Sequence, residues 1–109
     1  MIEKEITIPT NKGPKKVLEN NIIRVEASSN YCKIFFSNER PLVVAKVLHW
    51  FQDNLQEEMF CRIHRTHLIN RLYVSEVMES SMLKLSNGDM LQISRRKKGS
   101  SNSFLKQSA

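Results

Sequence analysis

Two clusters of basic and polar side chains in this 109-residue chain have the chemistry of a surface that binds polyanions. Residues 60–71 read FCRIHRTHLINR, residues 94–98 read SRRKK, and neither cluster contains an acidic residue. Arginine donates paired hydrogen bonds to guanine O6 and N7 and also neutralises phosphates, while Asn, Ser, Thr and His supply further donors. His64, Arg65 and Thr66 form such a set inside the first cluster.

The charge of the chain is consistent with such a partner. The formal net charge is +6 and the sequence pI about 9.6, which favours a polyanion, either nucleic acid or a membrane surface. No stretch reaches the ~18 apolar residues of a membrane span, and the N-terminus, MIEKEITIP, has acids where a signal peptide is basic. We therefore expect a cytoplasmic protein with no membrane partner, in which Cys32 and Cys61 remain reduced thiols.

One pattern resembles a metal or enzyme site. Cys61, His64 and His67 are spaced by three residues, and Cys32 could complete a tetrahedral zinc site. Residues three apart on a strand point to opposite faces, however, and no CxxC or HExxH motif accompanies them. A Cys61 nucleophile would also need an orienting group and a pocket. We therefore expect no enzyme activity, no metal and no cofactor, and a structural role for His67.

The elements that must position the two clusters are mostly β-strands. Ile6 and Ile8 alternate with other residues before a turn-forming stretch at residues 11–14. Residues 22–37 then read as two β-rich segments split by a polar loop at residues 28–30. The length of the chain is that of one domain with one modest core.

One amphipathic helix interrupts the strands at about residues 45–55. The prediction rests on apolar residues at helical spacing, namely Val44, Val47, Leu48, Phe51 and Leu55. We expect His49 to lie on the surface beside this stripe and Trp50 to pack along the side of the helix.

The clearest β-hairpin lies on both sides of Asn87 and Gly88. A two-residue loop would place Leu83 and Leu91 on different faces of the hairpin. A three-residue loop at residues 86–88, with Gly88 left-handed, pairs Leu83 with Leu91 and keeps the apolar side chains together. We predict the three-residue loop, which brings Ser94 and the basic run to the edge of the core.

Several separated motifs together resemble one family. They are VEASSNYCKIFF, a following helix, F-x-R-I-H-R-T-H-L-I-N and L-x-L-S-N-G-x-x-L-x-I-S-R-R. Over residues 15–98 the chain resembles the LytTR-type DNA-binding domain of bacterial response regulators and transcription factors. The resemblance implies a mostly β fold, an elongated arrangement of short antiparallel sheets with one helix. It also implies that loops, and not a recognition helix, enter successive major grooves of duplex DNA.

Carried over by position, the resemblance implies three DNA-binding loops. Their residues are Ser29, Asn30, Tyr31 and Lys33 in the first loop, His64, Arg65 and Thr66 in the second, and Arg95, Arg96, Lys97 and Lys98 in the third. On this basis residues 1–98 are expected to form a single LytTR-like domain, and residues 99–109 a flexible C-terminal tail. These 109 residues contain no receiver domain, which many relatives carry.

Each candidate residue has a structural alternative. Tyr31 could be a half-buried strand aromatic, Arg62 a solvated or acid-paired side chain, and Lys97 and Lys98 a solubilising tail. Asn70 is expected to cap or turn the chain.

Two functions follow from the sequence. The first is a sequence-specific, duplex-DNA-binding transcription regulator, with a second copy bound at an adjacent half-site as the resemblance implies. The alternative is a basic β-rich module that binds RNA or a protein. RNA binding would require exposed aromatic side chains for base stacking, and only 7% of the residues are aromatic.

Overall fold

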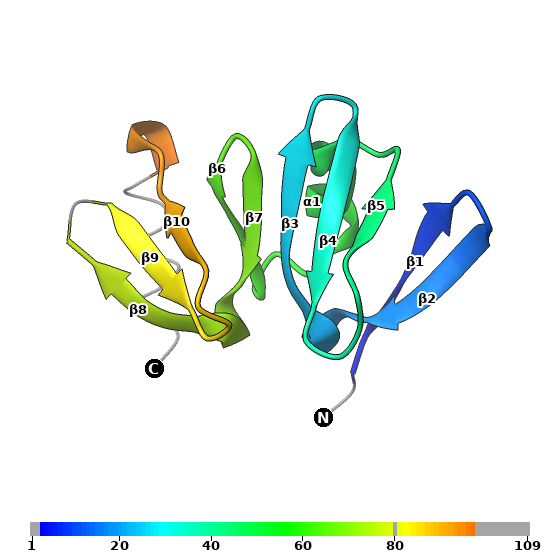
Figure 1. Cartoon of the computed structure of the whole chain (residues 1–109), viewed down its shortest axis with the longest axis horizontal. Helices are drawn as coiled ribbons and strands as arrows, with labels where there is room; N and C mark the ends of the chain where they lie inside the picture. The colour runs from blue at the N-terminus through cyan, green and yellow to red at the C-terminus, as the bar shows by residue number, and fades with distance from the viewer. Residues whose placement is uncertain (1–2, 80, 98–109) are drawn as a thin grey trace.

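The strands of this protein build three antiparallel sheets around one α-helix in the described residues, 3–79 and 81–97, of a computed structural model (Figure 1). The mostly β fold expected from the sequence is confirmed. The molecule measures 41 × 36 × 24 Å along its principal axes. Lys98 and the tail expected at residues 99–109 lie outside the described residues.

The first sheet is a β-hairpin at the N-terminal end. Strands β1 (Glu5–Thr10) and β2 (Gly13–Leu18) pair around a turn at Asn11 and Lys12. The turn is shorter than the predicted stretch at residues 11–14, because Gly13 and Pro14 already pair with β1. Alternate side chains of both strands face the protein interior, so the hairpin packs through one face.

The central sheet has five strands in the order β5-β4-β3-β7-β6. Its strands are β3 (Ile22–Ser28), β4 (Tyr31–Phe36), β5 (Leu42–Val44), β6 (Phe60–His64) and β7 (His67–Asn70). The polar loop between β3 and β4 is shorter than expected, because Ser28 pairs with Tyr31 and only Ser29 and Asn30 form the turn.

The helix is also shorter than the sequence predicts, since α1 spans Leu48–Asn54 and not residues 45–55. Val44 lies in β5 and pairs with Cys32, and Val47 is extended and 60% exposed. Strand pairing therefore overrides the helical spacing at Val44, whereas Val47 is the extended residue that precedes the helix. Leu48 and Phe51 are buried as expected.

The third sheet contains β8 (Val74–Met78), β9 (Met82–Leu85) and β10 (Met90–Gln92) in the order β10-β9-β8. Leu83 pairs with Leu91, and Gly88 has a φ of +96°, so the predicted three-residue loop is confirmed.

Two hydrophobic clusters occupy opposite faces of the central sheet. Successive strand residues point to opposite faces, and Ile22 and Ile23 accordingly belong to different clusters. The first cluster joins the central sheet to α1 and the N-terminal hairpin. The second joins it to the third sheet through Ile23, Ile63, Ile69, Leu83, Leu85, Leu91 and Ile93.

Two short 3-10 turns connect the sheets, η1 (Glu19–Asn21) and η2 (Arg71–Tyr73), and a third, η3 (Arg95–Lys97), follows β10. The buried Asn70 side chain accepts a hydrogen bond from the Leu72 N–H at 2.9 Å and caps η2. The capping role expected for Asn70 is confirmed.

Candidate nucleic-acid interface

The three loops predicted to bind DNA lie along one edge of the molecule. The β3–β4 turn, the β6–β7 turn and η3 all lie at the top of the view in Figure 1, so we call this side the loop edge. Their strands run in matching directions: β3, β6 and β10 each lead to this edge.

Backbone hydrogen bonds join the three loops in series. The Ala27 N–H, at the end of β3, donates to the Thr66 carbonyl at 2.9 Å. The Ser94 N–H, which precedes η3, donates to the Ile63 carbonyl at 2.8 Å. The second loop is therefore bonded to both of its neighbours, and the spacing of the three loops is set by the backbone.

The second loop orients His64 through Thr66. The Thr66 N–H donates to His64 Nδ1 at 3.2 Å, and the Thr66 hydroxyl lies 2.8 Å from the same nitrogen. Because Nδ1 accepts, the neutral ring carries its hydrogen on Nε2. His64 can thus offer one N–H donor to a ligand at the loop edge.

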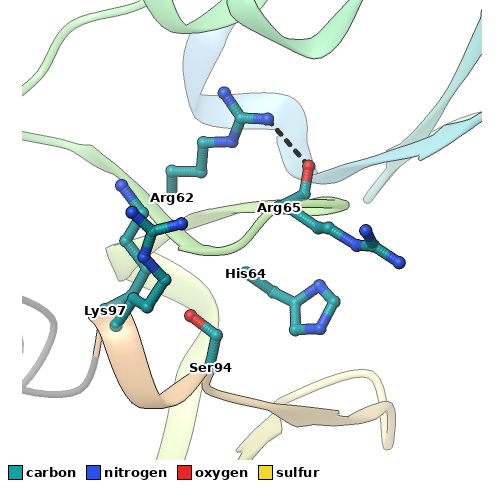
Figure 2. Close-up of a pocket in the computed structure, with 6 residues that line it drawn as sticks. Arg62, His64, Arg65, Ser94 and Lys97 are labelled. Atoms are coloured by element: carbon teal, nitrogen blue, oxygen red, sulfur yellow. Dashed lines mark hydrogen bonds between the residues drawn. The ribbon is translucent and has the colours of Figure 1, made fainter.

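Arg62, in β6, holds the backbone of this loop through its guanidinium group. Its Nη2 donates to the Arg65 carbonyl at 2.7 Å (Figure 2). Its Nη1 donates to Gln52 Oε1 at 3.2 Å. The hydrogen bonds of Arg62 thus go to neutral oxygens, so it is not the acid-paired side chain that the sequence left open. It holds the backbone of Arg65, whose own side chain is exposed.

A shallow pocket of about 450 Å³ separates the second loop from η3. Figure 2 shows Arg62, His64 and Arg65 on one side of this pocket, with Ser94 and Lys97 across from them. Arg96 also lines the pocket, and no acidic side chain does so. A pocket with this lining can accept an anionic group such as a phosphate.

The first loop turns its polar side chains outward. Ser29 has a φ of +54°, which forms a tight turn, and Asn30 is exposed. Tyr31 is 55% exposed, which excludes the half-buried alternative, and Lys33 is exposed on the same face of β4. Cys32 between them points inward, where burial raises its pKa to about 11 against the opposing charge of Arg62.

The third loop is more ordered than the sequence suggests. Arg95 and Arg96 are exposed in η3, and the Lys97 N–H donates to the Ser94 carbonyl at 3.0 Å. Lys97 is half-buried at the pocket and belongs to the turn, so it is not an extended solubilising tail.

A buried arginine fixes the third sheet against the central sheet. Arg24 in β3 has a side chain only 8% exposed, and it donates to Asp89 at 2.9 Å and to Glu26 at 2.6 Å. Burial opposes ionisation of Asp89, but hydrogen bonds from Arg24 and Asn87, together with the Arg24 charge, hold its pKa below the ordinary value. The carboxylate nearest the first loop, Glu26, is thereby paired.

His67 lies behind the second loop, as expected for a structural residue. Its Nδ1 is 4.0 Å from Glu26 Oε1, and its ring centroid is 5.5 Å from that of His64. Burial lowers the pKa of His67, and the charges of Arg24 and His64 lower it further against the attraction of Glu26.

Cys32 and Cys61 form no disulfide, which confirms the expected thiols. Over residues 3–79 and 81–97, no three His, Cys, Asp or Glu side chains are grouped to hold a metal ion. Within the same ranges, no helix is long and apolar enough to cross a membrane.

A family model described as the LytTr DNA-binding domain matches residues 14–106. The chain belongs to the LytTr DNA-binding domain family. A LytTr domain is a DNA-binding module and not a catalytic fold. DNA is thus the partner class implied by membership of this family.

A solved structure supports the fold of this LytTr domain. It is the LytTr DNA-binding domain from Bacillus cereus described as part of a methyl-accepting/DNA response regulator. The two chains are 19% identical and superpose with a TM-score of 0.80, over 94% of this chain and 97% of the other. Among curated proteins, none matches this LytTr domain.

Sequence reasoning found the three loops of the LytTr domain but missed two residues that position them. Arg24 acts through Asp89, which is distant in sequence. Arg62 bonds to the Arg65 carbonyl, three residues away, and to Gln52 in α1, and the strand pattern does not show that its side chain bends back to the loop. Ser94 was visible as the first residue of the SRRKK cluster.

Proposed function

We propose that this chain regulates transcription in the cytoplasm by binding duplex DNA sequence-specifically through loops that enter the major groove. Residues 1–98 form the single DNA-binding domain in this proposal. The observation that supports it is the series of three hydrogen-bonded loops on one edge, in which cations are exposed and acids are absent. Rigidly spaced donors of this kind suit a duplex, whose grooves repeat regularly.

The arginines of the second and third loops have the geometry required to read bases. Arg65 is exposed, and its backbone is held by Arg62, while Arg95 begins η3. A guanidinium on a fixed backbone can present its fork to guanine O6 and N7. The His64 N–H adds a donor beside Arg65, and the Thr66 hydroxyl, whose hydrogen faces His64 Nδ1, can accept a hydrogen bond.

The remaining candidates suit other contacts. Arg96 and Lys97 line the anion pocket, which fits one backbone phosphate, and Lys98 follows them in sequence. In the first loop Ser29, Asn30 and Tyr31 are exposed beside Lys33, so this loop can contribute hydrogen bonds and one aromatic face.

The direct test begins with selection of binding sites from a random duplex library, followed by affinity measurements. We expect one enriched motif, and tighter binding to the selected duplex than to a scrambled duplex or a single-stranded RNA. Equal affinity for the selected and scrambled duplexes would refute sequence-specific reading. The exposed Tyr31 could stack on RNA bases, so tighter binding to the RNA would favour the alternative module.

Single substitutions separate base reading from phosphate binding. We expect Arg65→Ala and Arg95→Ala each to cost ~1–3 kcal/mol on the selected duplex and much less on the scrambled one. Lys97→Ala should weaken both duplexes alike and reduce the salt dependence by about one phosphate contact. Lys84→Ala removes an exposed lysine of β9 and is the matched control. If the two arginine variants weakened both duplexes equally, their side chains would be phosphate clamps.

A second copy on an adjacent half-site completes the proposal. Affinity for duplexes with one and with two copies of the motif tests it, because cooperative binding requires the two-copy duplex to fill at a lower protein concentration than the one-copy duplex. Independent filling of the two sites would refute cooperativity and leave DNA binding intact.

A further inference from the structure

Two further segments lie on the side of the first loop away from η3 (Figure 1). The connection between β5 and α1 at residues 45–47 lies near the loop edge, and the β1–β2 turn at Asn11 and Lys12 lies beyond it, lower in the view than the three loops. The family match begins at residue 14, so the β1–β2 turn precedes the matched region. Residues 45–47 lie within it.

Each of the two segments carries one lysine and no acid. Lys12 is exposed at the hairpin turn, and Lys46 is half-exposed, with its Nζ 5.6 Å from the centre of the Trp50 ring. In the part of the chain that the structure describes, neither lysine forms a salt bridge. The neighbouring Lys15 differs, because it pairs with Glu39 at 3.1 Å.

The β1–β2 turn is held in place against the second segment. A cleft of about 170 Å³ is lined by Asn11 and its neighbours on one side and by residues 44–46 on the other. Within the turn the Thr10 hydroxyl donates to the Gly13 carbonyl at 2.5 Å and accepts from the Lys12 N–H at 3.1 Å. The hairpin below is anchored because Ile6 and Ile8 are buried in the first cluster.

The position of the hairpin decides what it could contact. The β1–β2 hairpin and the third sheet, which leads to η3, lie at opposite ends of the long axis in Figure 1. That axis measures 41 Å, and one turn of duplex DNA is about 34–36 Å long. A duplex lying along the loop edge would therefore pass the hairpin about one helical turn from η3.

We propose that Lys12 and Lys46 form a phosphate anchor that extends the DNA contact beyond the three reading loops, at the flank of the site opposite η3. The inference rests on the proposed function, since it requires a duplex on the loop edge. A long, flexible ammonium side chain suits a phosphate better than a base edge. The anchor therefore adds affinity and register without adding sequence preference.

The test compares the wild-type chain with Lys12→Ala, Lys46→Ala and the double variant on the selected and scrambled duplexes over a salt series. Each lost phosphate contact should reduce the steepness of log affinity against log salt by about 0.9. The loss of affinity between ~50 and ~200 mM salt should thus be about 3- to 4-fold smaller for each contact removed. The ratio of affinities for the two duplexes should not change. Lys84→Ala is again the control, and thermal melting of each variant checks that the fold is retained.

A second measurement locates the anchor on the DNA. Hydroxyl-radical footprinting should show that the double variant loses backbone protection at one flank, on the side away from η3. Shortening the duplex at that flank should abolish the difference between the double variant and the wild type.

The outcomes separate this inference from the proposed function. If Arg65→Ala and Arg95→Ala reduce specificity while the double lysine variant keeps the wild-type salt slope and footprint, the anchor is refuted and the proposed function stands. A change in the affinity ratio would show that the lysines contact bases, which also overturns the anchor. If the wild-type chain selects no duplex, both proposals fail.

Discussion

Asn70 links the central sheet to the two turns on either side of it, and its replacement by alanine should destabilise the fold. The side chain is fully buried, and its Nδ2 donates to the Ile22 carbonyl at 2.9 Å. Its Oδ1 accepts from the Leu72 N–H at 2.9 Å. Asn70→Ala removes both of these hydrogen bonds and a longer one, of 3.4 Å, from Nδ2 to the Glu19 carbonyl, and it leaves no polar group in their place.

The size of the effect depends mainly on the burial of the two groups that lose the shorter hydrogen bonds, the Ile22 carbonyl and the Leu72 N–H. The Ile22 carbonyl belongs to a fully buried residue, so losing its partner should cost ~1–3 kcal/mol. Leu72 is 62% exposed, so water can partly replace its lost acceptor and the cost should stay below ~1 kcal/mol. We therefore expect a total loss of ~1–4 kcal/mol, of which the Ile22 carbonyl accounts for most.

Urea unfolding followed by circular dichroism measures this loss. Asn54→Ala is the matched control, because the Asn54 side chain donates to the Trp50 carbonyl at 2.7 Å on the exposed side of α1. We expect the control to cost less than ~1 kcal/mol. If Asn70→Ala lay within ~0.5 kcal/mol of the wild type, the Ile22 carbonyl would not depend on Asn70, and the reasoning would be wrong.

Three further predictions concern backbone conformation, protonation and thiol chemistry. Gly88→Val should cost ~1–2 kcal/mol or more, because valine is strained at a φ of +96°. A Cβ there would meet nothing within 4 Å, so the cost comes from the backbone and not from a clash. Urea unfolding like that of the wild type would contradict the left-handed conformation of Gly88. The pKa of His67 lies below its ordinary 6.5, so the unfolded state takes up the proton first and the free energy of unfolding should fall as pH drops below 6.5. Unfolding measured at several pH values should show this dependence reduced in His67→Gln, and an unchanged dependence would refute it. A thiol reagent at neutral pH should modify Cys61 well before Cys32, because Cys32 is buried and has a pKa of about 11. Mass spectrometry after timed labelling measures the two rates, and equal rates would show that burial does not protect Cys32.

Local rules in the sequence determined much of this fold. The parity of side chains along a strand required Leu83 and Leu91 to share a face, and only a three-residue loop with a left-handed Gly88 satisfies that requirement. The composition of the two basic clusters likewise predicted an anion-binding edge. These features could be predicted because periodicity, glycine conformation and charge are properties of short segments.

The helical spacing of apolar residues predicted a helix that begins too early in the chain. Val44 and Val47 fit the helical stripe, yet the edge of the central sheet offered Val44 a strand partner in Cys32. Pairing between segments distant in sequence cannot be weighed from periodicity, and it shortened the helix to Leu48–Asn54.

The arrangement of the candidate interface was decided by tertiary contacts. The hydrogen bonds from Ala27 to Thr66 and from Ser94 to Ile63 join loops that are far apart in the sequence, and nothing in either segment predicts its partner. Arg62 bonds to the nearby Arg65 carbonyl and also to Gln52 of α1, and the second contact depends on where the helix lies in the folded chain. The sequence by itself determined which residues could bind DNA, whereas the tertiary structure decided their spacing, because spacing depends on hydrogen bonds and packing between separate strands.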